Sequence, residues 1–201
     1  MKQNNILMFV AVVAVTIALF NLIVTINKVD DIKTLTGFAT DTGTANLTIE
    51  GAAAVNFTTD IVNWGSGQVN ASEGTRAELN TYPGQVTAGT WTPVTQGLIL
   101  ENIGNSNVTL NLTSSKDATD FIGGTNPIFQ WRVTNNKTGS CTTAPSPAAY
   151  SNINTSTHLT CPIFQWVNTA DALEIDLNVT IPADANSGAK GMVITATATA
   201  I

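Results

Sequence analysis

The chain has 201 residues, of which only 11% are charged, and its net charge is −6 at pH 7. Globular proteins usually carry about a quarter of charged residues, and a nucleic-acid interface needs clustered Lys and Arg. The chain has eight Lys and Arg in total, and they are scattered. We therefore expect no nucleic acid among its partners.

Residues 6–26 form an apolar run of 21 residues without a single charge. As a helix, this run would span about 30 Å, the thickness of a bilayer core. A helix that is apolar on all sides must be covered on all sides, by lipid or by copies of itself. Three interpretations follow: a cleaved signal peptide, a membrane anchor, and a helix that packs in a filament core. Signal-peptide cores are about 7–15 residues long, which favours the two interpretations that keep the helix.

Beyond the run, apolar residues continue at spacing three among charged residues as far as Leu35. This pattern predicts one helix that continues to about Leu35 and ends at Gly37. The predicted organisation is a hydrophobic N-terminal helix over residues 1–36, a linker or possible donor strand over 37–50, and an extracellular β-sandwich domain over 51–201.

Short alternations of apolar and polar residues predict strands in the rest of the chain. Such alternations are present at residues 46–50, 55–57, 98–100 and 108–112. Between the last two, the sequence Gly-Asn-Ser-Asn at 104–107 consists of residues that favour turns. It predicts a hairpin that joins these two strands.

The pentapeptide Pro-Ile-Phe-Gln-Trp occurs twice, at residues 127–131 and 162–166. Proline suits the first position of a strand because it has no N–H to donate to a ladder. Both copies are therefore predicted to begin strands. The two aromatic residues of each copy are expected to face the same side of their strand, because successive side chains alternate.

The clearest predicted strand covers residues 173–181, where apolar residues alternate with polar ones such as Asp176 and Asn178. The apolar side chains are expected to face the core and the polar ones to face solvent. Residues 184–188 are predicted to turn the chain, and residues 192–201 to return as the second strand of a closing hairpin.

Threonine is unusually abundant, with 32 residues in the chain, and β-branched residues favour strands. Eight or more short strands with turn signals between them follow the one long helix. The predicted fold class is mainly β with one long N-terminal α-helix, and the domain is an immunoglobulin-like or jelly-roll β-sandwich.

Cys141 and Cys161 are the only cysteines. An even count in a chain with an export signal predicts a disulfide. The 19 residues between them are rich in Ser, Thr, Asn and Pro, so this loop has little core of its own. In the chain-entropy model, a crosslink that closes such a loop contributes about 3 kcal/mol.

Eight asparagines open the sequon Asn-x-Ser/Thr, which accepts N-linked glycans at the surface of exported proteins. A simpler interpretation is that Asn and Thr alternate on exposed strand faces. The candidate acceptors are Asn46, Asn56, Asn70, Asn107, Asn111, Asn136, Asn154 and Asn178.

No constellation of residues points to catalysis, and we expect neither an enzyme nor a bound metal or cofactor. The single histidine, His158, has no partner at the spacing of a metal site. The carboxylates Glu174 and Asp176 are assigned to the solvent face of a strand. The motif Asp-x-Asn-x-Gly at 184–188 has only part of a calcium loop.

In layout, the chain resembles archaeal surface-filament subunits of the type IV pilin-like class. The resemblance rests on the helix over Ile6–Leu35, on the Thr-rich strands, and on Gly-Phe-Ala-Thr at 37–40 and Asn-Leu-Thr-Ile at 46–49. Members of this class have a long hydrophobic N-terminal helix followed by a β-sandwich head, which is often N-glycosylated. The residues before the run, Lys-Gln-Asn-Asn at 2–5, lack the basic stretch and small residue of class III signal peptides. The resemblance therefore does not extend to the processing signal.

The resemblance implies a structural function at the cell surface. The chain would insert into the membrane through its helix, and copies of it would then assemble into a homopolymer. The helices would bundle in the filament core, and the heads outside would meet cell-surface or glycan ligands in adhesion. The residues expected in the bundle core are Phe9, Val13, Ile17, Phe20 and Val24. The alternative is a monomeric membrane-anchored surface domain that binds envelope components or other cells.

Overall fold

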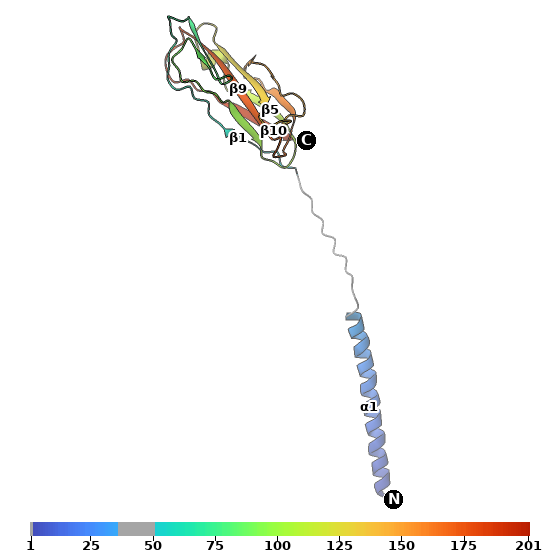
Figure 1. The fold of residues 1–201 in the computed structure, drawn as a ribbon. Helices are drawn as coiled ribbons and strands as arrows, with labels where there is room; N and C mark the ends of the chain where they lie inside the picture. The colour runs from blue at the N-terminus through green and yellow to red at the C-terminus, as the bar shows by residue number, and fades with distance from the viewer. Residues whose placement is uncertain (1, 36–50) are drawn as a thin grey trace. The chain divides into compact units, whose positions relative to one another are not determined.

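The computed structural model describes the backbone of residues 2–35 and 51–201, and the side chains of residues 8–26 and 51–201. The protein is mainly β with one long N-terminal helix, and it divides into two compact units, Met1–Thr48 and Ile49–Ile201. The elements in chain order (Figure 1) are α1 (Lys2–Leu35), β1 (Val55–Thr59), β2 (Arg76–Asn80), β3 (Val86–Thr87), β4 (Leu98–Asn102), β5 (Val108–Ser114), α2 (Ala118–Phe121), β6 (Ile128–Asn135), β7 (Ser151–Asn152), β8 (His158–Phe164), β9 (Ala172–Pro182) and β10 (Ile194–Ala200).

Helix α1 is a single helix of 34 residues that ends at Leu35, as the sequence predicts. It contains neither Gly nor Pro, the two residues that most weaken a helix interior. Two threonines of its described stretch bond back to the preceding turn: Thr16 Oγ1 donates to the carbonyl oxygen of Val12 at 3.0 Å, and Thr25 Oγ1 to that of Asn21 at 2.7 Å. These bonds satisfy the hydroxyl groups within the helix itself.

The β domain consists of two antiparallel sheets. One has three strands in the order β10-β5-β8 and the other has seven. In the larger sheet β9 is central: β6 pairs along residues 173–180, while β4 and β2 pair with residues 172–175 and 178–182. Since a strand has only two edges, β4 and β2 lie end to end on the edge opposite β6. Strand β1 pairs with β4, β3 with β2, and β7 with β6.

The core lies between the inner faces of the two sheets. In β5 the buried residues Val108, Leu110 and Leu112 alternate with partly exposed polar residues. They pack in one cluster with Leu100 of β4 and Ile175 of β9, which are also fully buried. Full burial of each such side chain contributes about 1.5–3 kcal/mol. The domain is a β-sandwich, which confirms the predicted fold class.

The predicted hairpin at residues 104–107 is wrong. Strands β4 and β5 belong to different sheets, so this segment carries the chain across the sandwich. The buried side chain of Asn102 organises the crossing. Its Oδ1 accepts from the backbone N–H of Gly104 at 3.1 Å, and its Nδ2 donates to the carbonyl oxygens of Ser106 and Phe164. Turn-forming residues predict a change of direction, but they do not say which sheet the next strand joins.

The predicted closing hairpin is also wrong, because β10 pairs with β5 of the smaller sheet. The turn at residues 184–188 starts another crossing between the sheets, which is held at its beginning by Asp184. The backbone N–H and the hydroxyl of Thr125 donate to the two oxygens of this carboxylate at 2.9 and 2.6 Å. These hydrogen bonds lower the pKa of Asp184 below its ordinary value.

The two pentapeptides play different structural roles. The first begins β6 directly after Pro127, and its aromatic residues Phe129 and Trp131 are both buried, which confirms the prediction that they face the same side of the strand. The second lies at the end of β8, so the prediction that it begins a strand is wrong. Phe164 is the last residue of β8 and is fully buried, whereas Trp166 lies beyond the strand and is 46% exposed. The predicted strand at residues 46–50 lies outside the described residues.

Candidate functional surfaces

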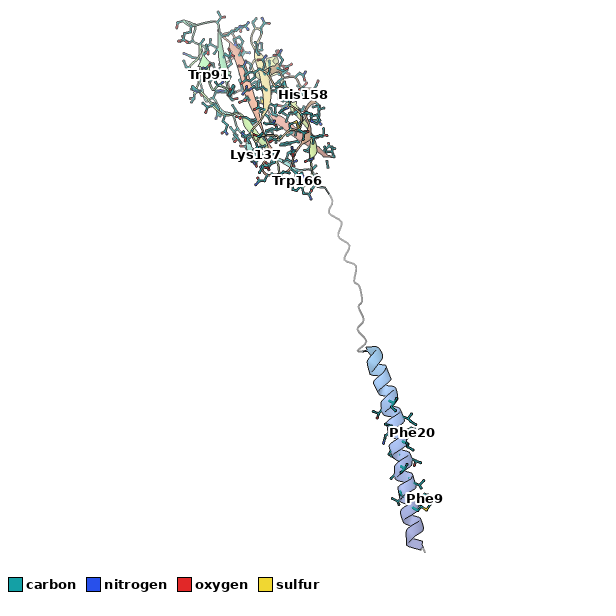
Figure 2. All side chains as sticks on the ribbon, turned by 45° about the vertical axis from the view of Figure 1, so that its right-hand side comes forward. Phe9, Phe20, Trp91, Lys137, His158 and Trp166 are labelled. Atoms are coloured by element: carbon teal, nitrogen blue, oxygen red, sulfur yellow. A yellow bond between two sulfur atoms is a disulfide. The ribbon has the colours of Figure 1, made fainter. Side chains whose placement is uncertain are left out.

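Helix α1 is the most apolar part of the described chain. Its stretch Met8–Ile26 has a mean hydropathy of 2.7 and is long and apolar enough to cross a membrane, by length and composition. Large apolar side chains are exposed on all its sides, and Phe9 and Phe20 in Figure 2 are 71% and 69% exposed. An apolar surface of this kind has to be covered by lipid or by other helices.

The five residues predicted for a bundle core follow spacings of four and three residues, so they lie along one face of α1. All five are exposed within the described chain, from 40% at Val13 to 71% at Phe9. The helix therefore leaves this face available to a partner.

Strand β10 forms one edge of the three-stranded sheet, and β5 is its only partner strand in the described chain. The backbone N–H groups of Val193 and Ile201 donate to Ser115 Oγ and to the carbonyl oxygen of Asn107, both next to β5. Because backbone groups alternate in direction along a strand, the odd-numbered residues of β10 face β5. The N–H and C=O groups of Ile194, Ala196, Ala198 and Ala200 therefore point away from β5, and no described strand pairs with them.

An apolar groove of about 260 Å³ lies beside the start of β10. It lies where the edges of the two sheets meet, since β1 is an edge strand of the larger sheet and contacts β10. Two of its apolar residues are strongly exposed: Ile61 by 70% and Val193 by 62%. The groove is lined by Phe57, Asp60, Ile61, Val62, Leu98, Leu177, Met192, Val193 and Ile194.

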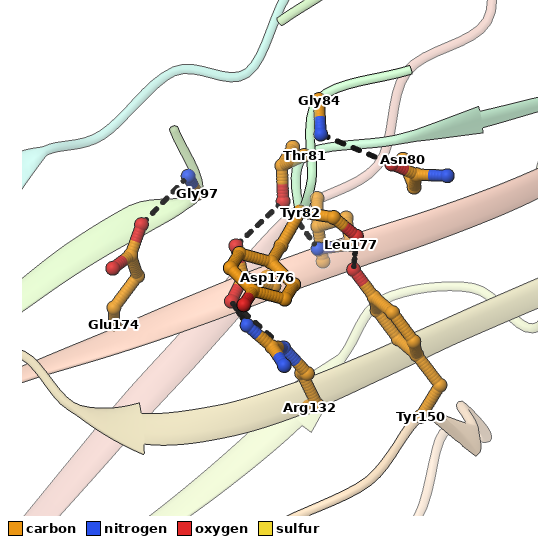
Figure 3. Close-up of polar contacts among 10 residues, drawn as sticks. All are labelled: Asn80, Thr81, Tyr82, Gly84, Gly97, Arg132, Tyr150, Glu174, Asp176 and Leu177. Atoms are coloured by element: carbon orange, nitrogen blue, oxygen red, sulfur yellow. Dashed lines mark hydrogen bonds and ion pairs between the residues drawn. The ribbon is translucent and has the colours of Figure 1, made fainter. Parts of the chain in front are cut away.

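A charged cluster lies on the outer face of the larger sheet (Figure 3). Asp176 of β9 is 1% exposed, so the prediction that it faces solvent is wrong. Its Oδ2 lies 3.0 Å from both Nε and Nη2 of Arg132, and its Oδ1 accepts from Thr81 Oγ1 at 2.9 Å. The guanidinium carbon of Arg132 lies over the ring of Tyr82, 3.7 Å from its centre, and 5.6 Å from the centre of the Tyr150 ring. The loop after β2 thus covers this face, and the carboxylate is fully partnered.

Glu174, the other carboxylate predicted on this face, lies closer to solvent. It is half-buried, and its Oε1 accepts from the backbone N–H of Gly97 at 3.2 Å. Both carboxylates therefore fix loops onto β9, which is a structural role.

Tyr150 gives the cluster a dependence on alkaline pH. Its hydroxyl donates to the carbonyl oxygen of Tyr82 at 3.0 Å. Burial, and secondly the negative charge of Asp176, raise the pKa of Tyr150 above its ordinary value. The neutral phenol therefore contributes stability that is fully present below about pH 10, the ordinary tyrosine pKa, and is lost as the pH rises through the raised pKa.

We expect the unfolding free energy of the wild type to fall more steeply above pH 10 than that of Tyr150→Phe. Denaturant titrations of both proteins over this range test the difference, and equal slopes would contradict it.

The sequons occupy different kinds of positions in the described domain. Asn56, Asn136 and Asn154 are exposed, and Asn70, Asn107 and Asn111 are half-buried. Asn46 lies outside the described residues. The exposed positions are spread over β1, the turn after β6 and the disulfide loop, so they present several separate parts of the surface.

Asn178 is the one candidate acceptor that the folded domain contradicts. It is 9% exposed in the central strand β9, and its Nδ2, the atom that would carry a glycan, donates to Gln130 Oε1 at 3.1 Å. A glycan at this nitrogen would have to displace Gln130 of the neighbouring strand. The prediction that Asn178 is an acceptor is therefore wrong for the folded protein.

Cys141 and Cys161 form a disulfide, as the sequence predicts. Both are buried, and Cys161 lies within β8 while Cys141 makes an isolated bridge to Phe164 of the same strand. The bond thus fastens the start of the long loop to a strand of the smaller sheet.

Replacing both cysteines with alanine is expected to lower the free energy of unfolding by about 3 kcal/mol. The reason is that the unfolded chain without the crosslink has a higher conformational entropy, because its loop is no longer closed. Urea denaturation of the full-length protein in detergent measures the effect. Thr142→Ala, an exposed neighbour of Cys141, is the control that should leave the midpoint unchanged. An equally unchanged midpoint in the double variant would contradict the prediction.

The other polar candidates have local partners. His158 Nε2 lies 3.3 Å from Ser146 Oγ, but no carboxylate contacts the ring in the described part of the chain, so the pair lacks the acid of a catalytic triad. Asp184, the first residue of the partial calcium motif, is bound to Thr125. Within residues 8–26 and 51–201 there is no group of three His, Cys, Asp or Glu side chains that could hold a metal ion.

No protein-family model, no curated protein and no solved structure matches the chain. The observations define a class by architecture: a β-sandwich protein with a long, exposed, apolar N-terminal helix. Sequence reasoning missed two features of the surface, the cluster around Arg132 and the open edge of β10. The first depends on a loop that folds over β9, and the second on β10 joining the other sheet. Neither has a local sequence signal.

Proposed function

We propose that the protein is a structural subunit of an extracellular, pilus-like filament, in which α1 helices bundle in the core and the β-sandwich heads lie outside. The observation that carries the proposal is α1 itself. It is one uninterrupted helix of 34 residues whose central part exposes apolar side chains on all sides. Copies of the same helix can cover that surface completely.

The length of α1 favours a bundle over a simple span. A helix of 34 residues is about 51 Å long, whereas the hydrocarbon core of a bilayer is about 30 Å thick. The apolar stretch Met8–Ile26 is long enough to span the bilayer, so the subunit can be held in the membrane before assembly. The part after Ile26 has alternating apolar and charged residues, which suits helix–helix contact outside lipid.

The surface of the head fits a role outside the cell. Its disulfide is typical of an oxidising compartment, and its exposed sequons can carry glycans. Adhesion to cell-surface or glycan ligands follows from this placement, because the heads would form the outer wall of the filament.

The second candidate is a monomeric surface domain anchored by the same helix. The length and hydropathy of Met8–Ile26 favour it, because this stretch matches a single membrane span. In that case the helix stays in lipid, and the head binds envelope components or other cells on its own.

Electron microscopy of material sheared from the surface of expressing cells, with mass spectrometry of the same fraction, tests the proposal. We expect thin filaments that contain peptides from both α1 and the head. If the protein is found only as a monomer in detergent-extracted membranes, the filament proposal fails and the anchored domain replaces it.

A further inference from the structure

We propose that the open edge of β10 accepts residues 46–50 of a neighbouring copy as an added strand, with Leu47 and Ile49 directed toward the apolar groove. The inference rests on the proposed function, because it supplies the contact between successive heads of a filament. It specifies which surfaces of two neighbouring heads are in contact, which the packing of the helices alone does not specify.

The edge itself is the first argument. Natural proteins usually protect edge strands with charges, prolines or bulges. Strand β10 reads Ile-Thr-Ala-Thr-Ala-Thr-Ala, with no charge and no proline, and its register with β5 is regular over all seven residues. Four of its residues direct N–H and C=O groups outward, as described above. Such an edge can form a ladder with an incoming strand.

The groove is the second argument. The side chains that alternate with the outward-facing threonines of β10 are small, and Ala196 and Ala198 are only partly buried against the core. The groove beside Ile194 has a volume of about 260 Å³, and a cavity of about 150 Å³ already holds a benzene molecule. Aliphatic side chains of an added strand therefore have room there, and they would cover the exposed Ile61 and Val193.

The occupant is argued from the pattern and position of residues 46–50. They read Asn-Leu-Thr-Ile-Glu. As an added strand, this sequence would place its two aliphatic residues on one face and its three polar residues on the other. The ten residues 36–45 between the end of α1 and this segment can span about 35 Å when extended, and the segment joins its own head directly at Gly51. A donor in this position therefore requires the donating and accepting heads to be in contact, as successive heads of a filament would be.

The type of contact also favours this occupant over pairing of β10 with a second β10. Pairing of two identical edges is symmetric and closes into a dimer, whereas an edge that receives a different segment makes a head-to-tail contact that can repeat. Only the second arrangement continues along a filament.

Engineered cysteines test which residues meet. We co-express two full-length variants, Thr48→Cys and Thr197→Cys, each with its own tag, and oxidise intact cells. Position 48 is the middle of the proposed donor and Thr197 the middle of β10, so the pair approaches whether the strands run parallel or antiparallel. We expect a covalent dimer in which mass spectrometry finds the 48–197 peptide pair. The matched control replaces Thr197→Cys by Thr87→Cys, which is exposed on β3 of the other sheet and should give no linked peptide.

A proline in β10 tests the ladder without breaking the fold. The N–H of Ala198 points outward, so Ala198→Pro removes a donor that β5 does not use. We expect Ala198→Pro to lose filaments by at least tenfold while the melting temperature of the head stays within a few degrees of the wild type. Ala198→Ser, which keeps the N–H group, should assemble normally. Normal filaments from a folded Ala198→Pro variant would overturn the inference.

The outcomes separate the inference from the proposed function. Filaments without a 48–197 link overturn the added strand and leave the filament standing. A link formed within one chain, seen in the Thr48→Cys/Thr197→Cys double variant as a crosslinked monomer, also overturns the neighbouring copy as donor. Absence of filaments from the wild type is the failure of the proposed function itself.

Discussion

Replacing Asp176 with alanine is expected to lower the free energy of unfolding by about 3 kcal/mol, the low end of the cost of breaking a buried ion pair. The low end applies because the side chain of Arg132 remains 19% exposed and water can partly solvate it. The variant would leave the guanidinium of Arg132, which lies near two tyrosine rings, without its counter-charge, and Thr81 Oγ1 without its acceptor. Urea denaturation of the full-length protein in detergent measures the loss.

Two matched variants separate the effect of the charge from that of the shape. Asp176→Asn keeps an oxygen for Thr81 but removes the negative charge. We expect a smaller loss of unfolding free energy that still exceeds about 1 kcal/mol, because a hydrogen bond to a charged group typically contributes about 1.5–3 kcal/mol. Glu73→Gln removes an exposed carboxylate in a turn and should change nothing measurable. If Asp176→Ala were as stable as Glu73→Gln, the cluster would not hold the loop.

The importance of Asp176 also shows what an alternating pattern can and cannot predict. The sequence of β9 predicts its length and the parity of its faces, because alternation is a local property of an extended chain. It cannot show that the polar face is covered, because the cover comes from residues 81–82 and from Arg132, which are far away in the sequence. The buried Asn178 is misassigned as a glycan acceptor for the same reason.

The connections between strands were the least predictable part of the fold. At residues 104–107 and 184–188 the turn residues correctly indicate where a strand ends. Whether the next strand pairs with the last or crosses to the other sheet is decided by the packing of the whole core. Two features illustrate this: the hydrogen bond from the buried Asn102 of β4 to Phe164 of the other sheet, and the contact of Asp184 with Thr125.

The repeated pentapeptide makes the same point with identical sequences. Its first copy begins β6, and its second ends β8. The second copy follows Cys161, which is already in the strand and fixed by the disulfide. Five residues therefore take opposite places in a strand according to what precedes them.

Within the proposed filament, replacing Ile17 with alanine is expected to raise the concentration needed for assembly by roughly thirtyfold. Ile17 lies on the face predicted for the bundle core, and truncating a packed isoleucine to alanine costs about 2–5 kcal/mol. A loss of about 2 kcal/mol per subunit corresponds to this change, since each 1.4 kcal/mol is a factor of ten. The yield of sheared filaments at a fixed level of expression, counted by electron microscopy, measures the effect.

Leu22→Ala is the matched control, because Leu22 lies on the opposite side of the helix and is exposed to a similar degree, 55% against 57% for Ile17. Both variants remove aliphatic carbons from the same apolar stretch, so a helix that stays in lipid should tolerate them equally. A bundle distinguishes them, because only one face contacts the centre. An equal loss of filament yield from both variants would contradict the assigned face. Unchanged amounts of both variants in the membrane, together with no filaments from the wild type, would identify α1 as an anchor.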